Sequence, residues 1–90
     1  MQVTVRYLSQ LKRAAECAEE RVDVADGCRL TDLLAQVATR HSDAFRAMLL
    51  DDASVPRKSL LFFVGDEHSE LTRVLRDGDE VMILTPMAGG

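Results

Sequence analysis

The sequence ends on TPMAGG, residues 85–90, and the group there that can do chemistry is the carboxylate of Gly90. An α-carboxylate is ionised at neutral pH and is a poor electrophile until it is activated. Gly89 and Gly90 lack a Cβ, so this end of the chain can enter a narrow channel with backbone angles that other residues avoid. Pro86 stiffens the base of the segment because its ring fixes φ. We therefore predict a flexible tail, residues 86–90, that delivers its own carboxylate to a recessed site.

Cysteine and histidine side chains are the other candidates for chemistry. Cys17 and Cys28 do not have the C-x-x-C spacing of redox or zinc motifs, and such cysteines in a cytosolic chain are most often buried or idle thiols. His41 and His68 are isolated in the sequence, and no third and fourth ligand accompany them at metal-site spacing. We therefore predict no metal site and no redox role for the thiols.

The composition is that of one ordinary globular domain, residues 1–90. The 90 residues are 47% hydrophobic and 29% charged, with a formal net charge of -4 at pH 7. The lack of a basic block argues against nucleic acid as a partner, and a mildly acidic domain suits a basic protein surface better. No stretch approaches ~18 consecutive apolar residues, and the start MQVTVRYL lacks the features of a secretory signal. We expect a cytoplasmic protein that does not enter the membrane.

Two stretches with alternating apolar and polar residues predict the first strands. They are QVTVRYL, residues 2–8, and ERVDVA, residues 20–25. Their apolar residues are expected to point inward: Val3, Val5, Tyr7, Val22 and Val24. Residues 9–19 between them are short and irregular, which favours a loop with at most one helical turn. The two strands would then form a hairpin with a long connection.

The stretch CRLTDLLAQVATRH predicts the main helix. Thr31 is the expected N-cap, and Asp32 suits the positive end of the helix. Apolar residues recur there at helical spacing and form one stripe: Leu33, Leu34, Val37 and Ala38. A second, shorter helix is expected from Asp43 to Leu50, followed by a loop rich in Asp, Ser and Pro.

The last part of the chain predicts two more strands. LLFFV, residues 60–64, is a continuous apolar run of the kind found in central strands, and VMILT, residues 81–85, is the final strand. RDGDE, residues 76–80, reads as a tight turn in which Gly78 supplies a positive φ. Residues 66–75 cross back with few apolar anchors.

This order of elements predicts an α+β domain. The expected architecture is a mixed sheet of four to five strands, with one main helix packed across it and a short second helix. If the first and last strands lie parallel at the centre, the main helix is the crossover between two halves. That arrangement is the β-grasp, or ubiquitin-like, fold.

The faces of the last two strands decide which side chains stay exposed. We expect Val81 and Ile83 to pack under the helix, with Leu61 and Phe63 beside them in the core. The opposite face would then carry an exposed apolar patch at the root of the tail: Leu60, Phe62, Met82 and Leu84. Such a patch usually marks a partner site, with its aromatic residue as the anchor. The alternative is that the segment before the central strand covers the patch.

The stretch DGDEVMILTPMAGG, residues 77–90, resembles the C-terminal signature of the MoaD/ThiS sulfur-carrier proteins, which are ubiquitin-like. The earlier elements fall in the order of that family, so the resemblance covers the whole chain, while residues 77–90 carry its specific part. The family often has Pro-Pro where this chain has Thr85 and Pro86, and an Asn near Gly65. Neither difference touches the terminal carboxylate.

The resemblance implies a carrier and not an enzyme. A ubiquitin-activating-type enzyme would adenylate Gly90 with ATP, and a sulfur donor would convert the acyl-adenylate into a thiocarboxylate. Gly89 would keep the tail narrow next to the reactive carboxylate, so that it can enter the partner's channel. No cofactor would stay bound to the carrier. The rest of the tail would contact the partners beside the apolar patch: Pro86, Met87 and Ala88. The sulfur acceptor would be the large subunit of molybdopterin synthase, because the segment 42–59 is too long for the most compact thiamine-type carriers.

Other functions fit the same features. A sulfur carrier for cysteine or thiamine biosynthesis would use the same tail. A ubiquitin-like modifier would be conjugated through Gly90 to lysines of other proteins, while Lys12 and Lys58 are the only lysines on this chain for self-conjugation. The least specific alternative is a binding module whose tail has no role.

Overall fold

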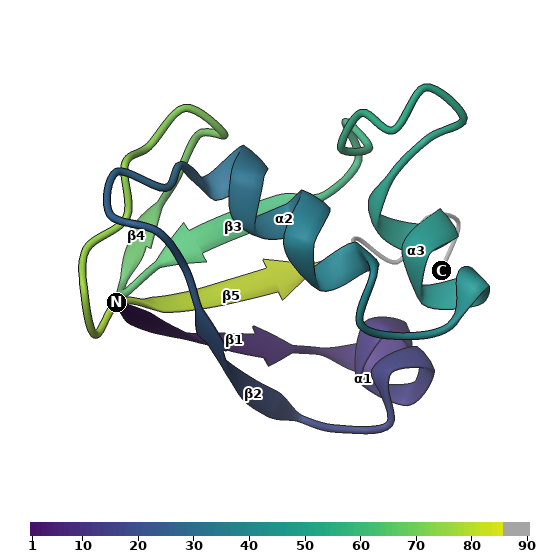
Figure 1. Ribbon diagram of the computed structural model, residues 1–90. Helices are drawn as coiled ribbons and strands as arrows, with labels where there is room; N and C mark the ends of the chain where they lie inside the picture. The colour runs from purple at the N-terminus through teal and green to yellow at the C-terminus, as the bar shows by residue number, and fades with distance from the viewer. Residues whose placement is uncertain (86–90) are drawn as a thin grey trace.

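The computed structural model describes residues 1–85 and shows a five-stranded mixed sheet with helices packed against it (Figure 1). The strands are β1 (Gln2–Tyr7), β2 (Glu19–Asp23), β3 (Leu61–Val64), β4 (Glu67–His68) and β5 (Glu80–Leu84). Their order across the sheet is β2-β1-β5-β3-β4. The central pair, β1 and β5, is parallel, and the other neighbours are antiparallel. This arrangement confirms the predicted β-grasp fold.

The helices lie over one face of the sheet and at one of its ends. They are α1 (Ser9–Ala15), α2 (Leu30–Ala38) and α3 (Asp43–Leu49). In Figure 1, α2 crosses the face of the sheet, while α1 and α3 lie at the end where β1 and β5 finish. Within the described part of the chain, the helices are too short to cross a lipid bilayer.

The hairpin of β1 and β2 is as predicted, but its connection is a helix. The inward residues of both strands are buried as expected: Val3, Val5, Tyr7, Val22 and Val24. The prediction of a loop was wrong because Leu11 and Ala15, which lie one helical turn apart on α1, form a buried face of that helix. The helix stops at Glu16, which adopts a left-handed φ of 61°. Packing against β1, α3 and β5 supplies the stability that this short helix lacks alone.

The start of α2 is capped by the backbone of a distant segment. The N–H of Leu30 donates to the carbonyl of Arg73 (2.9 Å), and that of Thr31 donates to the carbonyl of Leu71 (3.0 Å). Thr31 therefore lies inside the first turn, and its assignment as the N-cap was wrong. The carboxylate of Asp32 accepts from the N–H of Arg29 (3.0 Å), which precedes the helix. Backbone carbonyls within residues 66–75 therefore accept the first N–H groups of α2. The few apolar residues of that segment did not predict this contact.

The second predicted helix is confirmed, with its end differing by one residue. The hydroxyl of Ser42 accepts from the N–H of Phe45 (3.2 Å) and caps α3. Phe45 and Leu49 are buried. The ring of Phe45 meets the ring of Tyr7 edge to face, with centroids 5.2 Å apart. This contact joins α3 to the end of β1.

The strand at the sheet edge, β4, was not predicted. It is a two-residue strand, Glu67–His68, with both side chains exposed, so neither alternation nor an apolar run marks it. Gly65 makes the tight turn from β3 with a φ of 61°. Gly78 has a φ of 84° in the turn before β5, as predicted.

The central strand β3 faces the opposite way from the prediction. Phe62 lies beside Ile83 and Val64 beside Val81, so Phe62 and Val64 enter the core with exposures of only 5% and 3%. Leu60, just before the strand, is also buried at 6%. We expected Leu60 and Phe62 to be exposed and Leu61 and Phe63 to lie in the core. Both expectations were therefore wrong. The apolar run has no alternation, so only the register against β5 determines which residues point inward.

Candidate functional site

The tail and the strand that leads into it form the candidate site. β5 ends at Leu84, and Thr85 is the last described residue. The predicted tail residues lie outside the described part of the chain: Pro86, Met87, Ala88, Gly89 and Gly90. Their roles stay predictions, and the structure describes the chain up to Thr85.

On the helix-free face of the sheet, four apolar side chains of β3 and β5 meet. We call them the open-face patch: Leu61, Phe63, Met82 and Leu84. Leu61 pairs with Leu84 and Phe63 with Met82 across the antiparallel ladder of β3 and β5, which brings each pair into contact range. Leu61 is 42% exposed, and the other three are half-buried. Met82 and Leu84 were predicted here, whereas Leu61 and Phe63 replace Leu60 and Phe62.

Polar side chains border the open-face patch on both sides. Arg6 of β1 is the neighbour of Met82, and its guanidinium lies 2.8 Å from Glu80 and 3.8 Å from Glu19. On the other side the ring of His68 meets Phe63 edge to face, with centroids 5.6 Å apart. Exposed ion pairs of this kind add little stability. An apolar centre with a charged rim is the pattern of a protein–protein contact surface.

A second group of polar residues lies on the helix-covered side, near the end of β1. Oε2 of Glu20 accepts a hydrogen bond from the hydroxyl of Tyr7 (2.5 Å). The same oxygen lies 2.5 Å from Nε2 of His41. Its other oxygen lies 2.9 Å from Nε of Arg40. His41, which is isolated in the sequence, is therefore held by contacts between segments far apart in the chain. Sequence spacing does not predict the contact between Glu20 and His41, because the two residues are 21 positions apart and meet only once β2 has joined the sheet.

The surroundings of Glu20 change the pKa values in this group. Burial acts to raise the pKa of Glu20, but hydrogen bonds from Tyr7 and His41, with the charges of His41 and Arg40, outweigh it and lower that pKa. Burial and the bond to Glu20 raise the pKa of Tyr7, which keeps its hydroxyl protonated as a donor. Burial, followed by the charge of Glu20, raises the pKa of the Cys17 thiol. The charge of Arg40 opposes this rise without cancelling it, so the surroundings favour the protonated thiol.

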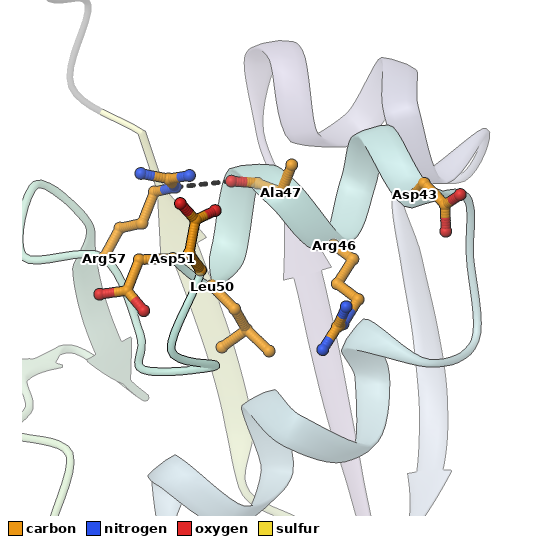
Figure 2. A pocket seen from close by; sticks show the side chains of 7 residues that line it. Asp43, Arg46, Ala47, Leu50, Asp51 and Arg57 are labelled. Atoms are coloured by element: carbon orange, nitrogen blue, oxygen red, sulfur yellow. Dashed lines mark hydrogen bonds between the residues drawn. The ribbon is translucent and has the colours of Figure 1, made fainter.

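A polar depression of about 230 Å³ lies between α3 and the loop that follows it (Figure 2). Nε of Arg57 donates to the carbonyl of Ala47 (2.6 Å), and Arg46 donates to Ser54 (3.1 Å). The carboxylate of Asp51 accepts two N–H groups of its own loop. Figure 2 shows Arg57 and Asp43 at opposite ends of α3, with side chains that do not converge. These groups hold the loop in place and do not form a reaction centre.

Comparison with known proteins decides the family. The model of the ThiS family matches residues 5–90 of this chain. The chain belongs to the ThiS family. It is 30% identical over 92 residues to the molybdopterin synthase sulfur carrier subunit of Chlamydomonas reinhardtii, with 100% of both chains covered. The resemblance in residues 77–90 is thereby confirmed.

Solved structures agree with the fold of this ThiS-family protein. SAMP1 from Haloferax volcanii superposes with a TM-score of 0.91 at 21% identity, and 100% of both chains is covered. The Amycolatopsis orientalis BexX/CysO complex contains a chain with a TM-score of 0.70 at 26% identity, with 98% of this chain and 99% of that chain covered. The protein therefore has the ubiquitin-like β-grasp fold of the small sulfur carriers.

Proposed function

We propose that this ThiS-family protein is a cytoplasmic sulfur carrier that serves as the small subunit of molybdopterin synthase. The observation that carries the proposal is the family match, which runs to Gly90 and so includes the Gly-Gly end. The full-length similarity to the C. reinhardtii sulfur carrier subunit favours the molybdopterin branch. The reactive group is the carboxylate of Gly90, and the protein is a substrate of its partners and not a catalyst.

The chemistry follows from the low reactivity of a carboxylate. A ubiquitin-activating-type enzyme binds ATP, and an oxygen of the Gly90 carboxylate attacks the α-phosphate and releases pyrophosphate. Sulfide supplied by a donor then attacks the acyl carbon and displaces AMP, which leaves a thiocarboxylate. The acceptor enzyme takes that sulfur, water supplies the oxygen that replaces it on the acyl carbon, and the carrier returns as a carboxylate. ATP is consumed on the partner, so the carrier needs no stably bound cofactor for these steps.

The open-face patch supports this proposal because it lies at the root of the tail. Leu84 belongs to the patch and is separated from the tail only by Thr85. A tail that enters a partner's channel is held there if an adjacent surface binds the same partner, which raises the effective concentration of the tail. Phe63, with its half-buried ring beside Met82, is the expected anchor of this contact.

Reconstitution tests the proposal. The chain is incubated with a ubiquitin-activating-type enzyme of the molybdopterin pathway, ATP and a sulfur donor, and its intact mass is measured. We expect the mass increase of one oxygen replaced by sulfur, and molybdopterin formation after the large subunit and its substrate are added. A chain without Gly90 is the control. Failure of the intact chain to acquire sulfur would overturn the carrier function.

The same experiment separates the alternatives. A loaded chain that gives no molybdopterin but supports cysteine or thiamine synthesis with the matching acceptor enzyme belongs to another carrier branch. A modifier would instead leave Gly-Gly remnants on lysines of other proteins, which peptide mass spectrometry of a cell extract detects. The likeness to SAMP1, at 21% identity, shows the fold and does not favour either role.

A further inference from the structure

Three side chains with metal-binding atoms meet behind the end of β1. They are Cys17 in the turn after α1, Glu20 in β2 and His41 between α2 and α3. The thiol, one carboxylate oxygen and one imidazole nitrogen all lie within 4.8 Å of one another, and all three residues are half-buried. The fold creates this group, since a backbone hydrogen bond from Tyr7 to the carbonyl of Ala18 (2.9 Å) holds the turn of Cys17 beside β1.

We propose that Cys17, Glu20 and His41 bind one Zn²⁺ ion. Thiolate, imidazole and carboxylate are the ligand types that zinc uses in proteins. Softer thiolate and imidazole donors disfavour Mg²⁺ and Ca²⁺, which prefer oxygen ligands only. With three ligands from the protein, the fourth tetrahedral position is left for water or an external ligand.

The spacing of the three atoms is close to that of a tetrahedral site. Zn–S bonds are about 2.3 Å and Zn–N and Zn–O bonds about 2.0–2.2 Å, which places ligand atoms roughly 3.3–3.7 Å apart. The separation between Glu20 and His41 is 2.5 Å, so it must open by about 1 Å when the ion enters. The widest spacing allowed by the group, 4.8 Å, must close by a similar amount. These shifts must come from the three side chains, which belong to a turn, an edge strand and a connecting segment.

The surrounding residues would orient the ligands. Arg40 binds the Oε1 atom of Glu20 at 2.9 Å, which leaves Oε2 for the ion. Tyr7 donates to Oε2, and its ring and that of Phe45 flank His41 at centroid distances of 5.9 and 4.6 Å. Ligating carboxylates and imidazoles in metal sites are held by such outer contacts.

Binding of the ion also displaces protons. A carboxylate and a thiolate together neutralise Zn²⁺, the proton of the thiol passes to solvent, and any proton on Nε2 of His41 leaves as well, because only a neutral imidazole nitrogen binds a metal. Arg40 stays paired with Oε1 of Glu20 at 2.9 Å as a neighbouring positive charge in this group. The contacts of Glu20 with His41 and Arg40 account for those three residues. They give no role to the sulfur of Cys17, which the fold places beside them.

Zinc titration of the reduced full-length chain tests the site. We expect one equivalent to bind with a dissociation constant below about 10 μM, and excess zinc to raise the melting temperature because the unfolded chain lacks the site. Substituting Cys17→Ser or His41→Gln should weaken binding at least about tenfold. Co²⁺ should give a thiolate-to-metal charge-transfer band that is lost in the Cys17→Ser variant.

The chain supplies its own matched controls. Cys28→Ala and His68→Gln change the other cysteine and the other histidine, and both variants should bind zinc as the unchanged chain does. Circular dichroism checks that each variant is folded. Where a ligand variant does not fold, the Co²⁺ charge-transfer band of the unchanged chain decides whether a thiolate binds the metal. Absence of that band, or equal zinc affinity in the Cys17→Ser variant, overturns the site whether or not the chain carries sulfur.

Discussion

Phe63 and Phe62 are neighbours in β3 with opposite environments, which makes them a matched pair. Phe63→Ala removes the aromatic ring of the open-face patch and should weaken binding to the activating enzyme by ~1–3 kcal/mol, with little loss of stability. Phe62→Ala opens a cavity beside Ile83 and should lower the free energy of unfolding by about 3–5 kcal/mol. Calorimetric binding and urea unfolding of both variants measure this. Equal effects of the two substitutions on binding would contradict the assigned faces.

The glycines are expected to matter for chemistry and not for stability. Deleting Gly90, or replacing Gly89 by Trp, should abolish sulfur loading, because the carboxylate is displaced or the tail no longer fits the channel. The free energy of unfolding should change by less than ~0.5 kcal/mol, as for other surface changes. Intact mass after the loading reaction and thermal unfolding provide the two readouts. Full loading of the Gly90-deleted chain would show that another group carries the sulfur.

The thiols should be dispensable for sulfur transfer. In the proposed chemistry sulfur is bound to the acyl carbon of Gly90, so the double variant Cys17→Ser, Cys28→Ala should load at the rate of the unchanged chain. Time-resolved intact mass measures this rate. A folded double variant that cannot load would indicate a persulfide relay through a cysteine.

At the scale of the elements, the start of α2 can be weakened without touching the core. The Asp32 carboxylate holds the N–H of Arg29 at 3.0 Å, so Asp32→Ala should cost about 1 kcal/mol of unfolding free energy. Asp52→Ala, at an exposed loop position, is the control of equal charge change. Urea unfolding compares the two. An equal loss in both variants would mean that only net charge matters.

Some of the elements could be predicted from the sequence alone, and others could not. The alternation in β1 and the helical stretch that begins at Asp43 are local signals, so both could be predicted. The faces of β3 could not, because an apolar run such as residues 60–64 has no parity until β5 pairs with it. The cap of α2 and the group around Glu20 depend on contacts between distant segments. For the tail the reverse is true: its chemistry is predicted from Gly89 and Gly90 alone, because they lie outside the described residues 1–85.

At the scale of the whole molecule, the sheet depends on its last strand. β5 lies between β1 and β3 and contributes the buried side chains of Val81 and Ile83. A chain that stops at Asp79 should therefore lose cooperative unfolding, whereas one that stops at Thr85 should keep it. Circular dichroism during urea titration distinguishes them. Cooperative unfolding of the shorter chain would contradict the central role of β5.

The central position of β5 also has a consequence during synthesis. The ribosome makes β1 first and β5 after every other strand, so the two halves of the sheet cannot join until the end of β5 has left the exit tunnel. Such long-range pairing is slow to form and must await translation of the final segment. An activating enzyme that recognises the open-face patch would then bind only chains whose β5 has been made, because Met82 and Leu84 belong both to β5 and to the open-face patch. Recognition of the folded surface would thereby act as a check that translation has passed β5, the strand that precedes the predicted reactive carboxylate of Gly90.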